Sequence, residues 1–334
     1  MTNNNTFNKL MSSPKKTTCV IVLPPLGELS DLDIGIRNWL SRSKARFNIT
    51  YNHTLNNVLP FFGEYKKVTN YGALRYLGET SQKPQHFIAA ADPILLHTQR
   101  DQLNIKTIIN CIEIKKEILE AYIEIQNQIS NNFSVELIHN GFNGYMLCKK
   151  SFPSSLYSPY EISGKAIHDV MPSNDLSRKY GKLINEIQMI IHNSDFIKHE
   201  LFNSLWVWGG GKLSPHNNIK LPKLFSNDPI LRGYWSLTSN ESDNYEQDFE
   251  DFLSNQDGAF VVVTPENTSL FSSQKKELEL FLSAVYRYYK KTHPEQLVLI
   301  FRDGWQMQIK PLHKYFFWRN TKSLQSIKSL YYAN

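Results

Sequence analysis

The sequence predicts a layered α/β fold with a largely parallel sheet flanked by helices. Continuous apolar runs rich in β-branched residues, at residues 19–23 and 258–263, are typical of strands that are covered on both faces. Between such runs lie longer segments, such as residues 113–129, in which apolar residues recur every three or four positions. Strands that alternate with helices favour parallel pairing, because a parallel connection needs a crossover segment.

Composition sets the class of protein. The 334 residues are 41% hydrophobic and 20% charged, which excludes a disordered, collagen-like or disulfide-stapled chain. The 37 Lys and Arg exceed the 31 Asp and Glu by six, a mild excess that permits an anionic partner but does not call for nucleic acid.

Cys19, Cys111 and Cys148 fit no zinc or disulfide pattern, so we expect buried thiols in a reducing cytoplasm. No run approaches the roughly 20 apolar residues of a membrane span, so no membrane partner is expected.

The predicted organisation has two α/β halves. Residues 1–16 are expected to form a flexible tail, because nothing in them anchors to a core. Residues 17–150 would form the first half, residues 151–174, rich in Pro and Ser, a connection, and residues 175–334 the second half. A single domain over residues 17–334 is the alternative.

Each half contains clear element signals. In the first half we expect strands at 19–23 and 86–91, helices at 31–40, 54–61, 71–77 and 113–129, and a hairpin of 135–138 with 145–148. The strand at 86–91 is expected to end at Asp92-Pro93, a common turn signal. In the second half we expect helices at 175–192 and 272–291, strands at 204–208 and 258–263, and a hairpin of 296–301 with 305–309.

The segment from Ala91 to Asp101 is the first candidate site. It follows a predicted strand, and ligands of open α/β sheets gather at the carboxyl ends of strands. Asp92 has the chemistry to hold a metal or a hydroxyl, and Arg100 to clamp a phosphate or carboxylate. On spacing alone the simpler interpretation is favoured, in which Asp92 caps a turn and Arg100 pairs with Asp101 at the surface.

The predicted helix at 175–192 carries two stripes. Apolar residues share one face, namely Leu183, Ile184, Ile187, Ile190 and Ile191. Beside them Asn185, Gln188 and His192 form a polar stripe, which either reaches a ligand or lies along a solvated helix edge. No zinc-binding pattern accompanies this stripe.

A strand with a glycine run follows. After Asn203 and Ser204, the strand is closed by Gly209, Gly210 and Gly211, whose backbone N–H groups are able to approach a phosphate. The run lacks the Lys-Ser/Thr of a P-loop, so this signal is weak. Trp206 and Trp208 share a strand face and are expected to pack in the core.

Aromatic and basic residues mix near the end of the chain. Tyr315, Phe316, Phe317, Trp318 and Arg319 follow Lys310, His313 and Lys314. Such a segment either stacks bases and holds phosphates or docks on the domain. We favour docking here and expect no nucleic-acid partner.

Three of these segments together resemble the bacterial RpfE-type regulatory protein family, which is grouped with the cofactor-independent phosphoglycerate mutases. Members carry a similar N-E-I-Q-M-x-x-H helix, matched by residues 185–192, and a similar N-S-L-W-x-W-G-G-G strand, matched by residues 203–211. They also carry an A-D-P-V-H-L-R-A-D-R-D segment, matched by residues 91–101. Leu95 stands where the family tends to have His, and His97 where it tends to have Arg. The matches run in order over nearly the whole chain.

The resemblance implies an alkaline-phosphatase-like fold and a phosphoglycerate mutase activity with two divalent metals and a Ser or Thr nucleophile. Such metals need an Asp just after the first strand and Asp-His pairs near the last strands. Here residues 24–27 are Pro-Pro-Leu-Gly, and no Asp-His pair occurs in the sequence. We therefore expect no metal site and no cofactor, with a divalent metal as the alternative.

The function expected from the sequence is that of a mutase-related pseudoenzyme with a regulatory or small-anion-binding role. The ligand would be a small phosphorylated or carboxylated compound; the alternatives are an active metal-dependent mutase or phosphatase and a structural or protein-interaction module. The candidate ligand-binding residues are Asp92, His97, Arg100, Asp101, Asn185, Gln188, His192, Asn203, Ser204, Gly209, Gly210 and Gly211.

Overall fold

The computed structural model describes most of the chain. The described residues are 17–27, 32–47, 53–99, 102–108, 115–172, 175–194, 201–213, 220–238, 242–243, 249–256, 258–264 and 271–319. The expected tail at residues 1–16, the candidates Arg100 and Asp101, and Cys111 lie outside them.

The chain forms two compact units that are both discontinuous in sequence. Unit 1 comprises Met1–Thr50, Pro222–Ser226 and Asp243–Asn334, and unit 2 comprises Tyr51–Leu221 and Asn227–Ser242. This division differs from the expected halves, because both halves of the sequence contribute to each unit. Residues 151–174, expected as a connection, belong to unit 2, where the backbone of Ser155 bonds to Val207 and Gly209.

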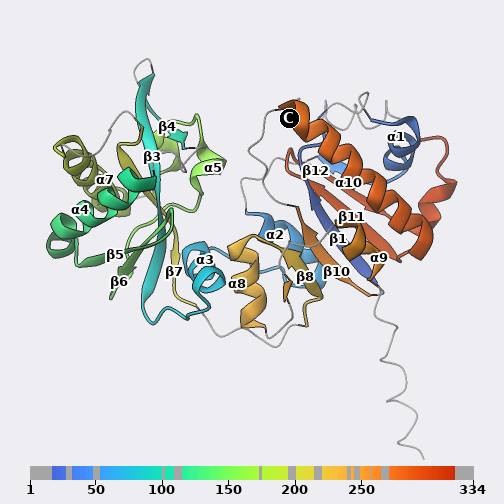
Figure 1. Cartoon of the computed structure of the whole chain (residues 1–334), viewed down its shortest axis with the longest axis horizontal. Helices are drawn as coiled ribbons and strands as arrows, with labels where there is room; N and C mark the ends of the chain where they lie inside the picture. Colours follow the sequence, from blue (N-terminus) through green and yellow to red (C-terminus); the bar gives the residue numbers. More distant parts are fainter. Residues whose placement is uncertain are drawn as a thin grey trace, which may run out of the picture. The chain divides into compact units, whose positions relative to one another are not determined.

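The described residues of unit 1 form a seven-stranded mixed sheet in the order β2-β12-β11-β1-β10-β8-β9, whose strands β12, β11, β1, β10 and β8 are labelled in Figure 1. The central strands β8, β10, β1 and β11 pair in parallel, whereas β12 and β2 add an antiparallel edge. The prediction of a largely parallel sheet is thus confirmed only for this centre. The strands are β1 (Thr18–Leu23), β2 (Lys44–Phe47), β8 (Lys223–Ser226), β9 (Ser242–Asp243), β10 (Phe260–Val263), β11 (Gln296–Phe301) and β12 (Trp305–Ile309).

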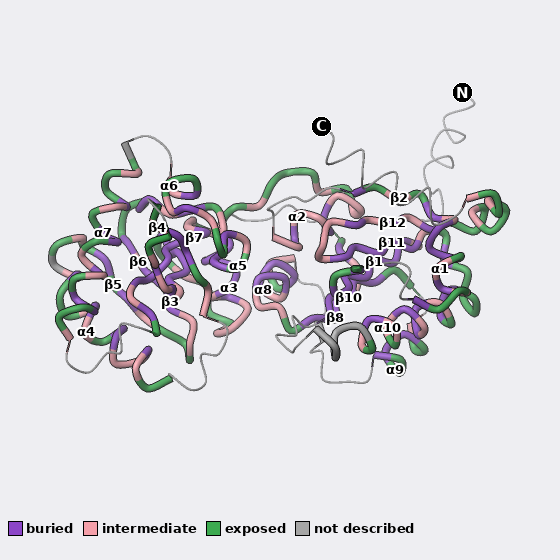
Figure 2. The backbone as a smooth tube through the Cα atoms, turned by 90° about the horizontal axis from the view of Figure 1, so that it is seen from above, coloured by how far each residue is buried: buried purple, intermediate pink, exposed green. Residues whose placement is uncertain are grey.

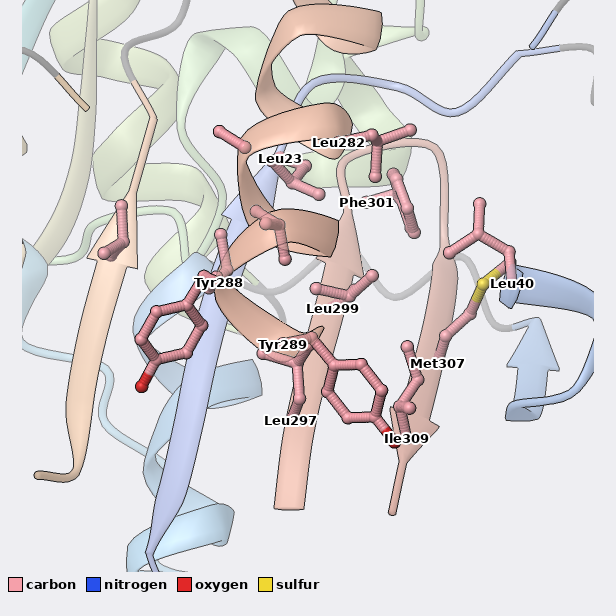
Figure 3. Packing of buried hydrophobic residues seen from close by; sticks show 14 of the residues in the cluster. Leu23, Leu40, Leu282, Tyr288, Tyr289, Leu297, Leu299, Phe301, Met307 and Ile309 are labelled. Carbon is pink, nitrogen blue, oxygen red and sulfur yellow. The ribbon is translucent and has the colours of Figure 1, made fainter. Parts of the chain in front are cut away.

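Helices and a hydrophobic core cover one face of this sheet. The helical elements are α1 (Ile34–Ser41), α9 (Phe249–Ser254), α10 (Phe271–Thr292) and the 3₁₀ turn η3 (Pro311–Tyr315). Leu282, Tyr288 and Tyr289 of α10 pack toward the strands, where alternate residues such as Leu297 and Leu299 form the same cluster (Figure 3). These residues form the buried face of α10, and strands β1 and β10 are buried along their whole length (Figure 2).

The described residues of unit 2 form a five-stranded sheet in which every strand pairing is antiparallel, in contrast to the prediction. Its order is β4-β3-β6-β5, with β7 on the other edge of β3. The strands are β3 (Phe87–Gln99), β4 (Gln102–Thr107), β5 (Val135–Asn140), β6 (Asn143–Cys148) and β7 (Ser204–Gly211). The hairpin predicted around residues 140–144 is confirmed as β5 and β6.

Helices lie on both faces of this sheet. On one face α4 packs against β5 and α7, which in turn contacts β7; on the other, α3 contacts β3 and β7 and is backed by α8 (Figure 1). The elements are α2 (Thr54–Val58), η2 (Leu59–Phe62), α3 (Tyr71–Thr80), α4 (Lys115–Phe133), α5 (Pro159–Ile162), α6 (Ile167–Val170), α7 (Asp175–His192) and α8 (Pro229–Leu237). Among the described residues, no helix is both long and apolar enough to cross a bilayer.

Candidate functional site

Asp92 lies in the middle of a strand rather than at a strand end. The expected break at Asp92-Pro93 is wrong, because β3 continues through both residues to Gln99. On one edge of β3, Pro93 pairs with Leu205 of β7. On the opposite edge, residues 87–90 pair with β6 and residues 94–99 pair with β4, so Pro93 lies in the gap between these two partner strands. No neighbouring strand needs the missing N–H there, so the proline does not end the strand.

Asp92 forms a buried ion pair with Arg75 of α3. Nη1 of Arg75 lies 2.8 Å from Oδ2 of Asp92, and Nε1 of Trp208 donates to the same oxygen at 2.7 Å. Nη2 of Arg75 donates to the Gly144 carbonyl, and its guanidinium lies 4.8 Å from the Tyr145 ring centroid. Burial opposes the charge on Arg75, but Asp92, Tyr145 and Glu79 together outweigh burial, and the net pKa of Arg75 is raised. The pair joins α3 to the sheet.

The same network continues to Glu79. Its carboxylate accepts from the Tyr145 hydroxyl at 2.6 Å and from Nδ2 of Asn143 at 2.6 Å. Burial raises the pKa of Tyr145, and although Arg75 lowers it, the net direction is upward. Tyr145 therefore remains a hydroxyl donor to Glu79 at neutral pH. Asp92 thus belongs to a network of structural contacts across α3, β3 and β6.

Asn203 also makes backbone contacts. Its Oδ1 accepts from the Leu96 N–H at 2.7 Å, and its Nδ2 donates to the Leu96 carbonyl at 2.8 Å. The Asn203 amide therefore replaces a strand partner at the start of β7. Ser204 is fully buried, and His97 is half-buried on β3.

The three glycines lie inside β7 and not in a loop after it. A Cβ atom at Gly209 would lie 2.8 Å from Cβ of Tyr71, one at Gly210 would lie 2.5 Å from the Phe87 ring, and one at Gly211 would lie 2.5 Å from Cβ of Asn70. Close packing against these neighbours accounts for the run, and Gly209 also needs its left-handed φ of +60°.

The polar stripe of α7 faces outward. Asn185 and His192 are exposed and Gln188 is half-buried, whereas the predicted apolar face is buried. Tyr180 anchors the helix, because its hydroxyl donates to the Val207 carbonyl at 3.0 Å and lies within hydrogen-bonding distance of the Val207 N–H. The structure brings Asp92 to Trp208 and Asn203 to β3, and leaves Asn185 and His192 on the helix surface.

The carboxyl edge of the parallel strands in unit 1 is a candidate site that the sequence did not predict. The backbone N–H of Arg302, just after β11, donates to the Leu23 carbonyl at the end of β1 at 3.2 Å. Its guanidinium donates to Oγ1 and the carbonyl oxygen of Thr264, the residue after β10. The ends of β10, β1 and β11 are thereby held together, and a half-buried cation is fixed where α/β sheets place their ligands.

Asp303 lies beside this cation in sequence. Its Oδ2 accepts from the Gly27 N–H at 3.1 Å, and Gly27 has a left-handed φ of +63°. Its Oδ1 is buried and has no hydrogen-bond partner among the described residues. A buried unsatisfied carboxylate oxygen is rare in folded proteins. The sequence predicts these residues only as the turn between the strands at 296–301 and 305–309, although the position of Asp303 after a buried strand was an available signal.

The described residues of this edge do not supply the ligands of a two-metal centre. Two divalent ions need a set of carboxylate and imidazole ligands, whereas Asp303 is the one carboxylate among the described contacts here, and it adjoins Arg302. Across the described parts of the chain, no group of three or more His, Cys, Asp or Glu side chains is placed to hold a metal ion.

Comparison with known proteins gives structural neighbours only. No family model matches the chain, and no curated protein sequence matches it. One similar solved structure is a cofactor-independent phosphoglycerate mutase from Thermoplasma acidophilum, 13% identical, covering 89% of this chain and 90% of that one with a TM-score of 0.43. Another is the PH0037 protein from Pyrococcus horikoshii, 12% identical, covering 89% and 87% with a TM-score of 0.47. These scores carry no argument about activity, and the RpfE-type resemblance gains no support from them.

Proposed function

We propose that the protein binds a small phosphorylated or carboxylated hydroxy compound at the carboxyl edge of unit 1, without a two-metal centre. The observation that carries the proposal is the buried, unsatisfied Oδ1 of Asp303 next to Arg302. A ligand hydroxyl would donate to this oxygen and remove the cost of leaving it unsatisfied. A role in sensing or regulation fits such a site better than phosphoryl transfer.

Arg302 supplies the anion-binding group in this proposal. Bonds to Thr264 hold the Arg302 guanidinium at the carboxyl edge of the sheet, and the fixed fork of N–H donors in a guanidinium matches the oxygens of a phosphate or carboxylate. Charge-assisted bonds from arginine to a phosphate or carboxylate are among the strongest polar contacts in proteins. The pair of Arg302 and Asp303 would therefore select a ligand that carries an anionic group and a hydroxyl.

The second candidate function is a metal-dependent mutase or phosphatase. The same Asp303 oxygen favours it, because an unsatisfied carboxylate also attracts a divalent cation. This alternative is also the activity that is named for the Thermoplasma acidophilum neighbour. The adjoining Arg302 guanidinium disfavours a metal ion at this oxygen, because the two positive charges would repel each other.

The sequence-predicted residues around Asp92 give a second location for the same ligand class. Oδ1 of Asp92 and Nε of Arg75 are buried without a hydrogen-bond partner among the described residues. A ligand there would have to enter a network that already fixes both side chains. We therefore place the proposed ligand at Arg302 and use Asp92 as a comparison.

Thermal-shift measurements test the proposal. The probes are inorganic phosphate, glycerate, phosphoglycolate and 3-phosphoglycerate, each with a chelator and, in parallel, with Mg²⁺, Mn²⁺ or Zn²⁺. We expect at least one phosphorylated acid to raise Tm in chelator, and Arg302→Gln and Asp303→Asn to abolish the shift. Arg178→Gln, which removes an exposed positive charge on α7, should leave it intact. A shift that requires metal would favour the second candidate, and a shift lost only in Asp92→Asn would move the site to unit 2.

A further inference from the structure

The segment after β12 exposes an unusual concentration of large apolar side chains. Within seven residues, Leu312 is 68% exposed, Tyr315 59%, Phe317 77% and Trp318 63%. Scattered exposed apolar residues are ordinary, but a contiguous group marks an interaction site. With the basic residues described below, this group is called the aromatic–basic surface.

Docking of the segment after β12 on unit 1 explains only some of its aromatic and basic residues. Nη1 of Arg319 donates to the Ser43 carbonyl at 2.9 Å, and the Arg319 guanidinium lies 4.6 Å from the Phe316 ring centroid. These contacts fix the segment against the residues between α1 and β2. They leave Tyr315, Phe317 and Trp318 pointing into solvent, so the docking interpretation favoured from sequence does not explain the aromatic residues.

The surface is strongly cationic. Residues 305–319 contain Lys310, Lys314 and Arg319 and no acidic residue. The edge strand β2, which pairs with β12, adds Lys44 and Arg46, both exposed. The pKa of His313 is lowered by its partial burial and by the charges of Arg319, Lys310 and Lys44, so these cations lie close together. A neutral His313 avoids further repulsion, and an anionic partner would relieve the repulsion among the others.

The rings form a preorganised platform. His313 stacks on Phe316 with centroids 5.1 Å apart and an interplanar angle of 27°. Phe316 lies 5.2 Å from Trp318, which lies 5.4 Å from Phe317. Because each exposed ring is supported by a neighbour, little side-chain entropy remains to be lost when a flat partner stacks on it.

We propose that the aromatic–basic surface binds single-stranded nucleic acid. Phe317 and Trp318 would stack on bases, while Lys310, Lys314 and the β2 residues Lys44 and Arg46 would contact phosphates. Proteins that bind single-stranded nucleic acid commonly combine aromatic side chains, on which the unpaired bases stack, with basic side chains that contact the phosphates. A duplex hides those faces, so we expect it to bind more weakly. The surface lies on unit 1 and involves none of the residues of the proposed ligand site.

Trp318 makes the test direct. The other five tryptophans, Trp39, Trp206, Trp208, Trp235 and Trp305, are each at most 7% exposed. Quenching of intrinsic fluorescence by a stacked base would therefore report mainly on Trp318. The experiment titrates the full chain with 12-nucleotide oligo(dT) and oligo(U), follows fluorescence and anisotropy, and repeats the titration at several salt concentrations.

We expect quenching, a Kd that rises steeply with salt, and a loss of affinity of about fivefold or more in Trp318→Ala and Phe317→Ala. Lys310→Gln with Lys314→Gln should weaken binding and flatten the salt dependence. Tyr65→Ala removes an equally exposed ring from unit 2 and should change nothing. Absence of binding, equal affinity in Trp318→Ala, or preferential binding to phosphatidylserine vesicles or poly-glutamate would overturn the proposal.

Discussion

Nη1 of Arg75 lies 2.8 Å from Oδ2 of Asp92, and this ion pair joins helix α3 to strand β3 inside unit 2. The Arg75 side chain is 7% exposed, so little water screens the pair. The residue that first suggested a ligand site is thereby engaged in holding the antiparallel sheet to a helix.

Removing one partner of this pair should be costly. Asp92→Ala leaves the buried Arg75 charge without its carboxylate, and we expect the free energy of unfolding to fall by about 3–5 kcal/mol. The double variant Arg75→Met with Asp92→Leu should recover most of this loss, since it buries no charge. Urea unfolding measures both. Glu250→Gln, which breaks the exposed Arg287–Glu250 pair, is the control and should cost under about 1 kcal/mol. If Asp92→Ala lowered the free energy of unfolding by less than Glu250→Gln does, the structural role of the Arg75–Asp92 pair would be contradicted.

Two glycines set the crossing of α3 and α8. A Cβ atom on Gly78 would lie 1.9 Å from the Pro229 carbonyl oxygen, and one on Gly233 would lie 2.0 Å from the Leu74 carbonyl oxygen. Gly78→Ala should therefore force the helices apart and lower the unfolding free energy by about 1–3 kcal/mol. Gly258→Ala, where a Cβ meets nothing within 4 Å, should not lower it. Equal stability of the two variants in thermal unfolding would show that the helices cross differently.

The start of α8 gives a pH-dependent contribution to stability. Oδ1 of Asp228 caps the helix by accepting from the Ile230 N–H at 2.8 Å, and Oδ2 lies 3.3 Å from Nε2 of His53. Burial alone would raise the pKa of Asp228, but His53 and the helix N–H groups lower it overall. A folded pKa below the unfolded value of about 3.9 means that the carboxylate stabilises the fold above that pH and loses its effect as pH falls through the folded pKa.

Asp228→Asn keeps a capping oxygen but does not titrate. At pH 7 we expect it to lower the unfolding free energy by about 1 kcal/mol, and the gap to the natural protein should narrow below about pH 3.9. Urea unfolding at pH 7 and pH 3.5 measures this gap. The exposed Asp169→Asn serves as the control. A gap that widens on acidification would reverse the assigned direction of the pKa shift.

Local elements were predictable where periodicity was strong. The helix at Asp175–His192, the hairpin of β5 and β6, and the strands β1, β10 and β11 follow directly from apolar patterns in the sequence. The pairing of β7 with β3 was not predictable, because more than a hundred residues separate Asp92 from its partner Trp206 and no local signal encodes that register. The discontinuous units follow from such pairings.

Several candidate residues have patterns that fit two different structural roles. Asp92-Pro93 is a turn signal in isolation, yet β3 accommodates the proline in a gap between β6 and β4. Asp303-Gly304 is a hairpin turn, and the same turn places a half-buried carboxylate beside Arg302. Glycines 209–211 gave the pattern of a phosphate loop because close packing also demands glycine.

Calorimetric titration is the most direct test of anion binding at Arg302. The phosphorylated acid that gives the largest thermal shift is titrated, in chelator, into the natural protein, Arg302→Gln and Arg178→Gln. We predict binding to the natural protein and to Arg178→Gln with matching Kd, and a Kd raised about tenfold or more in Arg302→Gln. Equal affinity in all three proteins would contradict the assignment of the carboxyl edge of unit 1 as the ligand site.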